Sequence, residues 1–363
     1  MMSNDNKVTL KVGGMKYDGW TDVQITLSIK SLAGSFSIGF TERWPGQKTV
    51  WPIKAGAHCE VVIGQETVIT GYVDVVDAGY DANSHTLVIS GRDVAGDLID
   101  CTVDPKTYVS QSYEQILTSL AKPFGIQVIA KKDLSTVVPR LVLDPGETVF
   151  SVMDRVARAA GVCLMSSGTG DIFLSSSDCA TQALDSLVLG KNILKASSRT
   201  DFTQLYSQVV VSSQISGESL DKYDVLATQP KAELKRSDTA AMDSDMLNRY
   251  RPLRVIAESQ LDSNGCRQRA QWEVSHREAE AFELSVVVQG WRQSNGSLWK
   301  PNMLVKVEDE HLRINKTLLI TEVTYSLSSA GTTATLLLQP KEAFEPCPEI
   351  PKLSNTSDKY QVI

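Results

Sequence analysis

The chain has 363 residues, of which 42% are hydrophobic and 22% charged, and its 36 basic and 43 acidic residues give a net charge of −7. This composition is typical of a globular protein and excludes collagen-like, low-complexity and small disulfide-stapled classes. The length predicts two or three domains. Because no segment is basic enough to neutralise a row of phosphates, nucleic-acid binding is not expected to be the main function.

The N-terminal residues are polar, and no run of about 18 apolar residues occurs. The sequence therefore predicts neither a secretory signal nor a membrane-spanning helix, and it favours folding in a cytosol. The six cysteines are scattered without a close pair, which favours reduced, mostly buried thiols over disulfides or a zinc site.

Residues 1–100 have the pattern of short strands. Apolar and polar residues alternate over 23–29 and again over 36–40, and further apolar runs are separated by turn-forming residues. No helical pattern comes between them. We expect an N-terminal β-barrel domain here, since closure of the sheet removes exposed edges.

Residues 101–180 change to a mixed pattern that predicts a compact α+β module with two helices. Ser112 and Gln115 form a capping box before the first helix. The second helix is expected to have Asp144 as its N-cap and Pro145 at its first position, and to end at Gly161. A strand is expected at 126–130, and a hairpin should follow the second helix with its turn at 166–171.

Residues 181–345 return to alternating strands, which predicts a second β-barrel domain. It carries a polar, partly helical insertion near 212–281, in which 264–281 reads as a helix with i, i+4 charge pairs. Residues 346–363 are expected to form an extended C-terminal tail. The predicted fold class is α+β, mainly β, with two small β-barrel domains bracketing an α+β module.

The motifs of common enzyme classes are missing from the sequence: it has no phosphate-binding glycine loop, nucleophile elbow or His-Glu-x-x-His pair. Its four histidines do not stand at metal-ligand spacing. His58 beside Cys59 is the nearest approach to a reactive pair, but adjacent strand residues point to opposite faces, so a structural role is expected. We therefore predict no catalytic, cofactor-binding or metal-binding residue and no cofactor.

Two groups of residues, one of aspartates and one of tryptophans, each allow a functional and a structural interpretation. Asp93, Asp97 and Asp100 would suit acid/base chemistry if they shared a helical face, but pairing with Arg92 and solvent is the favoured interpretation. Five tryptophans would suit sugar stacking, although burial in cores or subunit contacts is favoured. These five are Trp20, Trp44, Trp51, Trp291 and Trp299. Trp272 lies in the 264–281 helix, which is expected to be a solvated or interface element.

Several short motifs follow one another over about 300 positions. In order they are Gly19-Trp20-Thr21, Ser28-Ile29-x-Ser31, Gly34-x-Phe36, Gly71-Tyr72-Val73-Asp74, Ser90-Gly91-Arg92-Asp93, Asp97-Leu98-Ile99-Asp100-Cys101, Glu147 to Gly161 with Arg155-x-Ala157-Arg158, Gly290-Trp291, Leu298-Trp299-x-Pro301-Asn302, Leu319-Ile320 and Gly331-Thr332. In this order they resemble the baseplate hub proteins of contractile-tailed phages, specifically the Mu-like tail protein group.

The resemblance implies a structural, non-enzymatic baseplate hub that forms a homotrimeric ring. With two barrels per subunit, such a ring adapts a six-fold tail tube to a three-fold spike. It implies the tail spike, the tail tube and other baseplate proteins as partners, with DNA passing through the channel without specific binding. The expected location is the virion tail baseplate, after assembly in the host cytoplasm. The alternatives are a peptidoglycan-cleaving tail enzyme that uses Asp93 or Asp97, and a sugar-binding adhesin that uses the tryptophans.

Overall fold

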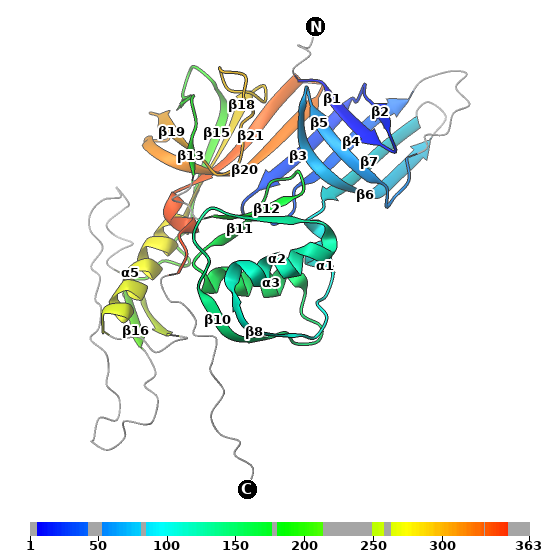
Figure 1. Ribbon diagram of the computed structural model, residues 1–363. Helices are drawn as coiled ribbons and strands as arrows, with labels where there is room; N and C mark the ends of the chain where they lie inside the picture. The colour runs from blue at the N-terminus through cyan, green and yellow to red at the C-terminus, as the bar shows by residue number, and fades with distance from the viewer. Residues whose placement is uncertain are drawn as a thin grey trace, which may run out of the picture.

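The structure is a computed structural model that describes residues 6–42, 53–80, 85–175, 180–212, 249–257, 263–329 and 331–347. Some of the predicted features lie outside these residues: Trp44, Trp51, residues 213–248 of the predicted insertion near 212–281, and nearly all of the predicted tail. Strands predominate, as the sequence predicts. They form two β lobes that lie side by side, with smaller helix-containing units below them (Figure 1).

The first lobe is an antiparallel arrangement of seven strands. These are β1 (Val8–Val12), β2 (Met15–Tyr17), β3 (Asp22–Ser28), β4 (Ser35–Glu42), β5 (His58–Ile63), β6 (Glu66–Tyr80) and β7 (His85–Asp93). The predicted alternation produces β3, where Val23 and Ile25 are buried while Gln24 is exposed.

The second lobe is assembled from more distant parts of the chain. Its strands are β13 (Thr181–Gln182), β14 (Leu187–Val188), β15 (Ile193–Thr200), β18 (Phe282–Gln289), β19 (Met303–Asp309), β20 (Ile314–Ser328) and β21 (Gly331–Gln339). The short β13 and β14 run parallel to β19, whereas the other pairs are antiparallel.

The same order of five paired strands occurs in both lobes. It is β3-β4-β7-β6-β5 in the first lobe and β15-β18-β21-β20-β19 in the second. The fourth strand of each set, β6 or β20, has 15 residues. Each also has one register shift against the third strand, between Val73 and Val75 in β6 and between Ile320 and Glu322 in β20. The chain thus carries one strand arrangement twice, which we call the five-strand unit.

The two lobes join where β3 pairs with β20, which we call the seam. Its register runs from Ser28 opposite Glu322 to Val23 opposite Leu327, and it merges both lobes into one sheet of 14 strands. One hydrophobic core extends through both lobes. In the described residues, strand pairing does not close either lobe into a ring, so the two closed barrels remain a prediction.

The mixed unit between the lobes in sequence has its own core. Its elements are α1 (Gly96–Asp100), β8 (Thr107–Ser112), α2 (Tyr113–Ala121), the 3-10 turn η2 (Lys122–Phe124), β9 (Gln127–Ala130), β10 (Val137–Val142), α3 (Val149–Ala159), β11 (Cys163–Ser166) and β12 (Asp171–Ser175). The predicted capping box is confirmed, because Ser112 Oγ accepts from Gln115 N at 3.2 Å and Gln115 Oε1 accepts from Ser112 N at 3.0 Å. The predicted hairpin is β11–β12.

The predicted start of the second helix is wrong. Helix α3 begins at Val149, and its N-cap is Thr148, whose Oγ1 accepts from Ser151 N at 3.1 Å. Gly146 has φ +90°, which a right-handed helix cannot contain, so Asp144 and its neighbours form a turn before the helix. The helix ends before Gly161, which is left-handed as predicted.

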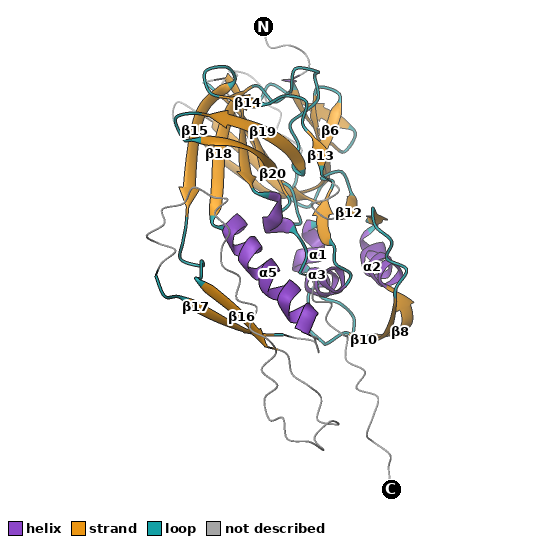
Figure 2. Ribbon diagram, turned by 90° about the vertical axis from the view of Figure 1, so that its left-hand side faces the viewer, coloured by secondary structure: helices purple, strands orange, loops and turns teal. Residues whose placement is uncertain are grey.

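A third small unit lies below the second lobe. The parallel pair β16 (Gln208–Ser212) and β17 (Pro252–Ile256) lies beside α5 (Ser263–Glu280), so the helix predicted at 264–281 is confirmed (Figure 2). Val209 and Val211 pack against Cys266 and Ala270 of the helix. The 3-10 turn η5 (Lys341–Phe344) follows β21 and contacts α5. Of the helices in the described ranges, none is long and apolar enough to cross a membrane.

Candidate functional site at the seam of the two lobes

The side of the sheet opposite the core carries a series of small neutral side chains around the seam. Because strand residues alternate between faces, the hydroxyls lie between the buried apolar residues of the same strands. We call this surface the hydroxyl face, and its residues are Thr26, Ser28, Ser35, Ser37, Ser90, Ser285, Thr324, Ser326, Thr333 and Thr335. Charged residues of both signs share this face by register: Glu283 and Glu322, and the cations Arg92, Lys195 and Arg199. Glu283 is paired with Lys30 at 2.9 Å.

Side chains contact each other across the seam on both faces of the sheet. On the hydroxyl face, the hydroxyls of Thr26 and Thr324 are hydrogen-bonded at 3.2 Å. On the core face, Ile25 lies opposite Tyr325, and both are fully buried. The seam therefore joins the lobes by backbone pairing, apolar packing and side-chain hydrogen bonds together.

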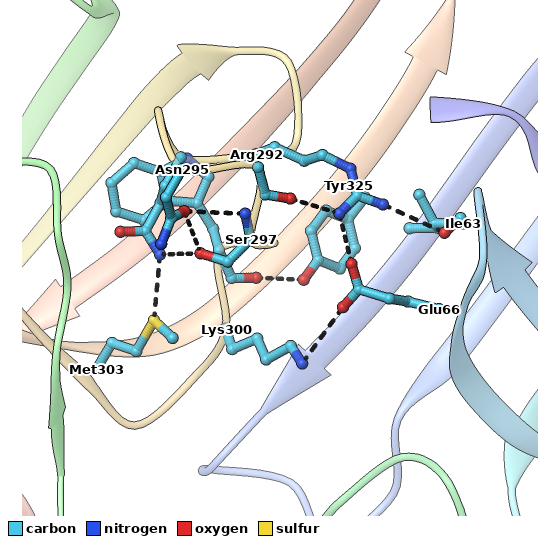
Figure 3. Close-up of polar contacts among 11 residues, drawn as sticks. Ile63, Glu66, Arg292, Asn295, Ser297, Lys300, Met303 and Tyr325 are labelled. Carbon is cyan, nitrogen blue, oxygen red and sulfur yellow. Dashed lines mark hydrogen bonds and ion pairs between the residues drawn. The ribbon is translucent and has the colours of Figure 1, made fainter. Parts of the chain in front are cut away.

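A polar cluster also ties the loop that follows β18 to the first lobe (Figure 3). Glu66, at the start of β6, forms ion pairs with Arg292 and with Lys300, the latter at 3.7 Å. Arg292 Nη2 also donates to the carbonyl of Ile63 at 3.3 Å. Its side chain is only 16% exposed, so this contact is partly shielded from solvent.

Two tryptophans near this cluster are buried. Trp291 Nε1 donates to the carbonyls of Ser326 and Thr333 at 3.2 and 3.0 Å, and the Trp299 carbonyl accepts from the Tyr325 hydroxyl. Burial raises the pKa of Tyr325, which keeps this donor protonated.

The tryptophans do not form a sugar-stacking surface in the described part of the chain. Trp20, Trp291 and Trp299 are 7%, 0% and 2% exposed, so they present no open ring face. Trp272 is half-buried; it stacks on His276 and donates to the Glu345 carbonyl at 2.9 Å. The favoured interpretation, burial, holds for the first three.

The carboxylates considered for acid/base chemistry lie on two different elements. Asp93 is the last residue of β7 and is 2% exposed, whereas Asp97 and Asp100 lie on the short helix α1. Asp93 accepts hydrogen bonds from Gly34 N and Ala95 N at 2.9 Å and from Ser166 Oγ at 2.7 Å. Burial raises the pKa of Asp93, and these three donors oppose the rise. Its contacts are those of a structural carboxylate.

Asp100 is paired as the favoured interpretation expects. Arg92 Nη2 donates to Asp100 at 2.6 Å, and Arg92 Nε donates to Asp74 at 2.9 Å. The hydrogen bond from Arg92 lowers the pKa of Asp100, and the two carboxylates raise that of Arg92. Asp97 lies on α1 with Asp100, whereas Asp93 is buried at the end of β7.

His58 and Cys59 are directed to opposite sides of β5. The Cys59 thiol is fully buried, and burial raises its pKa to about 12, so it is a protonated core residue. The exposed His58 ring packs edge-on against Tyr72 at a centroid distance of 5.6 Å. Among the described residues, no group of three His, Cys, Asp or Glu side chains could hold a metal ion.

The mixed unit meets the first lobe at the β11–β12 turn. Thr70 N donates to the Gly168 carbonyl at 2.7 Å. Ser166 Oγ, at the start of the turn, donates to the Asp93 carboxylate at 2.7 Å. Gly168 has φ +76°, and a Cβ there would lie 2.4 Å from the Val68 carbonyl oxygen, so only glycine fits. A cavity of about 500 Å³ opens beside this turn and reaches Lys300 of the second lobe.

Sequence reasoning missed the Glu66, Arg292 and Lys300 cluster. No local motif marks these residues, and Glu66 and Arg292 are 226 positions apart. The repeated five-strand unit was also missed, because β13–β15 and β18–β21 are separated by the β16–β17 and α5 excursion.

Comparison with known proteins matches three family models along the chain. They are the N-terminal domain of Mu phage baseplate assembly protein GpP-like (residues 7–93), the second domain of baseplate hub protein gp44-like (95–176) and the fourth domain of Mu phage baseplate assembly protein GpP (262–347). Baseplate hub protein gp44 of Escherichia phage Mu is 33% identical over 346 residues, which cover 93% of this chain and 89% of that protein.

Two solved structures resemble the whole fold. The 43 kDa tail protein of prophage MuSo2 from Shewanella oneidensis has a TM-score of 0.81 and 32% identity, covering 94% of this chain and 99% of that one. The tail protein of Neisseria meningitidis MC58 has a TM-score of 0.76 and 23% identity, covering 94% and 98%. The fold is therefore that of phage tail proteins. Within that class, the chain belongs to the Mu-like baseplate hub family.

Proposed function

We propose that this chain is the structural baseplate hub of a contractile phage or prophage tail and that it acts as a homotrimeric ring. The observation that carries the proposal is the duplicated five-strand unit in a chain of the baseplate hub family. Three chains would supply six such units around one axis. A ring of this kind can contact a six-fold tail tube on one side and a three-fold spike on the other.

Passage of DNA through the ring is the second part of the proposal, with the hydroxyl face lining the channel. Small neutral side chains make up most of this face, and two of its cations are already paired with carboxylates, Arg92 with Asp74 and Asp100 and Arg199 with Asp201, so the face offers few charged contacts to phosphates. The net charge of −7 also disfavours binding of the negatively charged DNA. Such a lining would let DNA move without being held.

The proposal includes the partners and the location. The spike, the tail tube and other baseplate proteins would contact the ring in the virion tail, after assembly in the host cytoplasm. It also includes a structural, non-catalytic role and closure of each lobe into a barrel. The division into 1–100, 101–180, 181–345 and a tail at 346–363 belongs to it as well, and the family matches at 7–93, 95–176 and 262–347 support that division.

The trimer is tested by measuring the mass of the purified chain in solution and imaging the particles by negative-stain electron microscopy. Three copies of the 39.7 kDa chain should give a particle of about 119 kDa with a central hole. A particle without a passage, or a chain that stays monomeric at about 50 µM both alone and with its spike and tube proteins, would contradict the proposal.

A further inference from the structure

The cavity beside the β11–β12 turn is bounded by all three parts of the chain that meet there. The first lobe contributes Val68 of β6, the mixed unit contributes Lys131 and Phe173, and the second lobe contributes Lys300 and Met303. Its volume of about 500 Å³ is in the range of pockets that bind a small molecule or the end of a peptide. The proposed ring function does not use this cavity.

Two lysines bring positive charge to the cavity. Lys131 follows β9, and its Nζ lies 5.0 Å from the centre of the Phe173 ring, which holds the ammonium group against this wall. Lys131 forms no ion pair among the described residues. Lys300 is 53% exposed and lies 3.7 Å from Glu66. Because Glu66 also pairs with Arg292, the charge of Lys300 is only partly compensated.

Among the described residues that line the cavity, Asp93 is the single carboxylate. Its Oδ1 accepts from Ala95 N, and its Oδ2 accepts from Gly34 N and Ser166 Oγ, so both oxygens already have donors. The lining therefore carries two cations against one saturated acid, in a chain whose net charge is −7. This local excess of positive charge favours an anionic ligand.

An amide of the lining has an acceptor without a donor. Asn302 Oδ1 is buried, and no hydrogen-bond donor reaches it among the described residues. The backbone around it is fixed, because Asn302 N donates to the Ile320 carbonyl at 2.8 Å and the Asn302 carbonyl accepts from Thr181 N at 3.2 Å. Buried acceptors almost always have a donor, so this atom calls for an N–H or O–H group from a ligand.

Much of the remaining wall is apolar and can adapt its shape. Met165 of β11 and Met303 of β19 lie in the lining together with Leu27 and Phe173. Methionine side chains are unbranched and flexible, so they can close around apolar groups of different shapes. A ligand that fills the cavity therefore needs an apolar group close to its anionic group.

We propose that this cavity binds the carboxyl end of a partner protein. The terminal carboxylate pairs with Lys131 and Lys300, the N–H of the last residue donates to Asn302 Oδ1, and the last side chain is apolar and packs against the methionines. A chain end combines these three features in one residue, and capture of a terminal carboxylate is a recurring mode of peptide recognition. The bound end would link the mixed unit to the second lobe through the two lysines.

Three small probes test the recognised groups one at a time. In a saturation-transfer NMR titration of the full chain at about pH 7, N-acetyl-leucine should bind with a Kd of about 1–5 mM. N-acetyl-leucinamide, which lacks the carboxylate, should bind at least about tenfold more weakly. N-acetyl-N-methyl-leucine, which lacks the N–H group, should bind about fivefold more weakly.

Variants of the chain test the residues that recognise these groups. Lys131→Met and Lys300→Met should each weaken binding of N-acetyl-leucine by about three- to tenfold. Lys132→Met is the matched control, because Lys132 is exposed and lies next to Lys131 but outside the lining. Asn302→Gly keeps a residue that tolerates φ of +62°, and it should abolish the difference between N-acetyl-leucine and its N-methyl analogue. Melting curves check that each variant is folded.

An octapeptide ending in leucine tests whether the ligand is a chain end. It should bind at least as tightly as N-acetyl-leucine, whereas the same peptide with a C-terminal amide should bind about tenfold more weakly. Binding of N-acetyl-leucine without binding of the octapeptide would mean that the cavity takes small acids, and it would overturn the proposal.

The remaining outcomes also decide the question. A wild-type chain that binds none of the probes below about 20 mM overturns the proposal, as do lysine variants that match Lys132→Met. The cavity is formed within one chain, so this inference goes beyond the proposed ring and does not depend on it. A monomeric chain that binds the octapeptide would overturn the ring alone, and a trimeric ring that does not bind it would overturn this inference alone.

Discussion

At the scale of single residues, Asp93 joins three separate segments. Its carboxylate accepts from the backbone at Gly34 and Ala95 and from the side chain of Ser166, so β4, the start of α1 and the β11–β12 turn meet at one group. A buried acceptor with three donors is costly to alter because each donor loses its partner.

Replacing Asp93 with Asn should therefore lower the unfolding free energy by about 1–3 kcal/mol, because the amide sets an N–H group against at least one of the three donors. Chemical denaturation measures the loss. Asp97→Asn is the control, since that carboxylate lies on α1 outside this network, and it should change stability by less than about 0.5 kcal/mol. Equal losses for the two variants would refute the assigned role of Asp93.

The pH dependence of the same pair of proteins tests the titration of Asp93. Because burial raises its pKa above the ordinary 3.8, folding favours the protonated form, and its contribution to stability is lost as pH rises through the raised value. The difference in melting temperature between wild type and Asp93→Asn should shrink from about pH 4 upward. A difference that grows with pH would mean that the three donors outweigh burial.

At the scale of elements, the β11–β12 turn positions the mixed unit on the first lobe. The turn can approach β6 this closely because Gly168 adopts a left-handed conformation and has no Cβ where its α carbon faces the backbone of β6. The turn also borders the cavity at the junction of the three parts, so its displacement would disturb the contacts of each part.

Gly168→Ala should destabilise the protein by about 2–4 kcal/mol, because it combines left-handed strain with a clash against the Val68 carbonyl. Gly170→Ala is the matched control. Gly170 also has positive φ, +111°, but a Cβ there meets its nearest atom only at 4.0 Å, so strain alone should cost about 1–2 kcal/mol. Urea denaturation compares the two, and an equal loss would exclude the clash as the cause.

At the scale of the whole molecule, the hydroxyl face and the negative charge predict weak contact with DNA. At about 0.15 M salt, the wild type should not bind a linear duplex at concentrations up to about 10 µM in a fluorescence anisotropy titration. Glu322→Lys should increase binding more than Glu114→Lys, because Glu322 is on the hydroxyl face and Glu114 is on the exposed side of α2. Wild-type binding below about 1 µM, or an equal effect of the two reversals, would contradict the proposed channel lining.

Much of the local structure follows from sequence patterns. Alternation marks β3, β4, β18 and β20, and Ser112 with Gln115 marks the start of α2. The beginning of α3 was misplaced because Asp144 and Pro145 resemble a helix start, whereas the left-handed Gly146 delays it to Val149. The family resemblance also follows from the sequence, since it depends on the order of short motifs.

The arrangement of those elements was decided only in three dimensions. The alternation of apolar and polar residues over a few positions indicates which side of a strand is buried. The partner of that strand, however, depends on contacts between distant segments. Thr26 and Thr324 meet at the seam although 298 positions separate them, and Asp93 leaves the expected helical face because it ends β7. The sequence alone therefore determined the elements and the family, and tertiary packing determined the repeated unit and the seam.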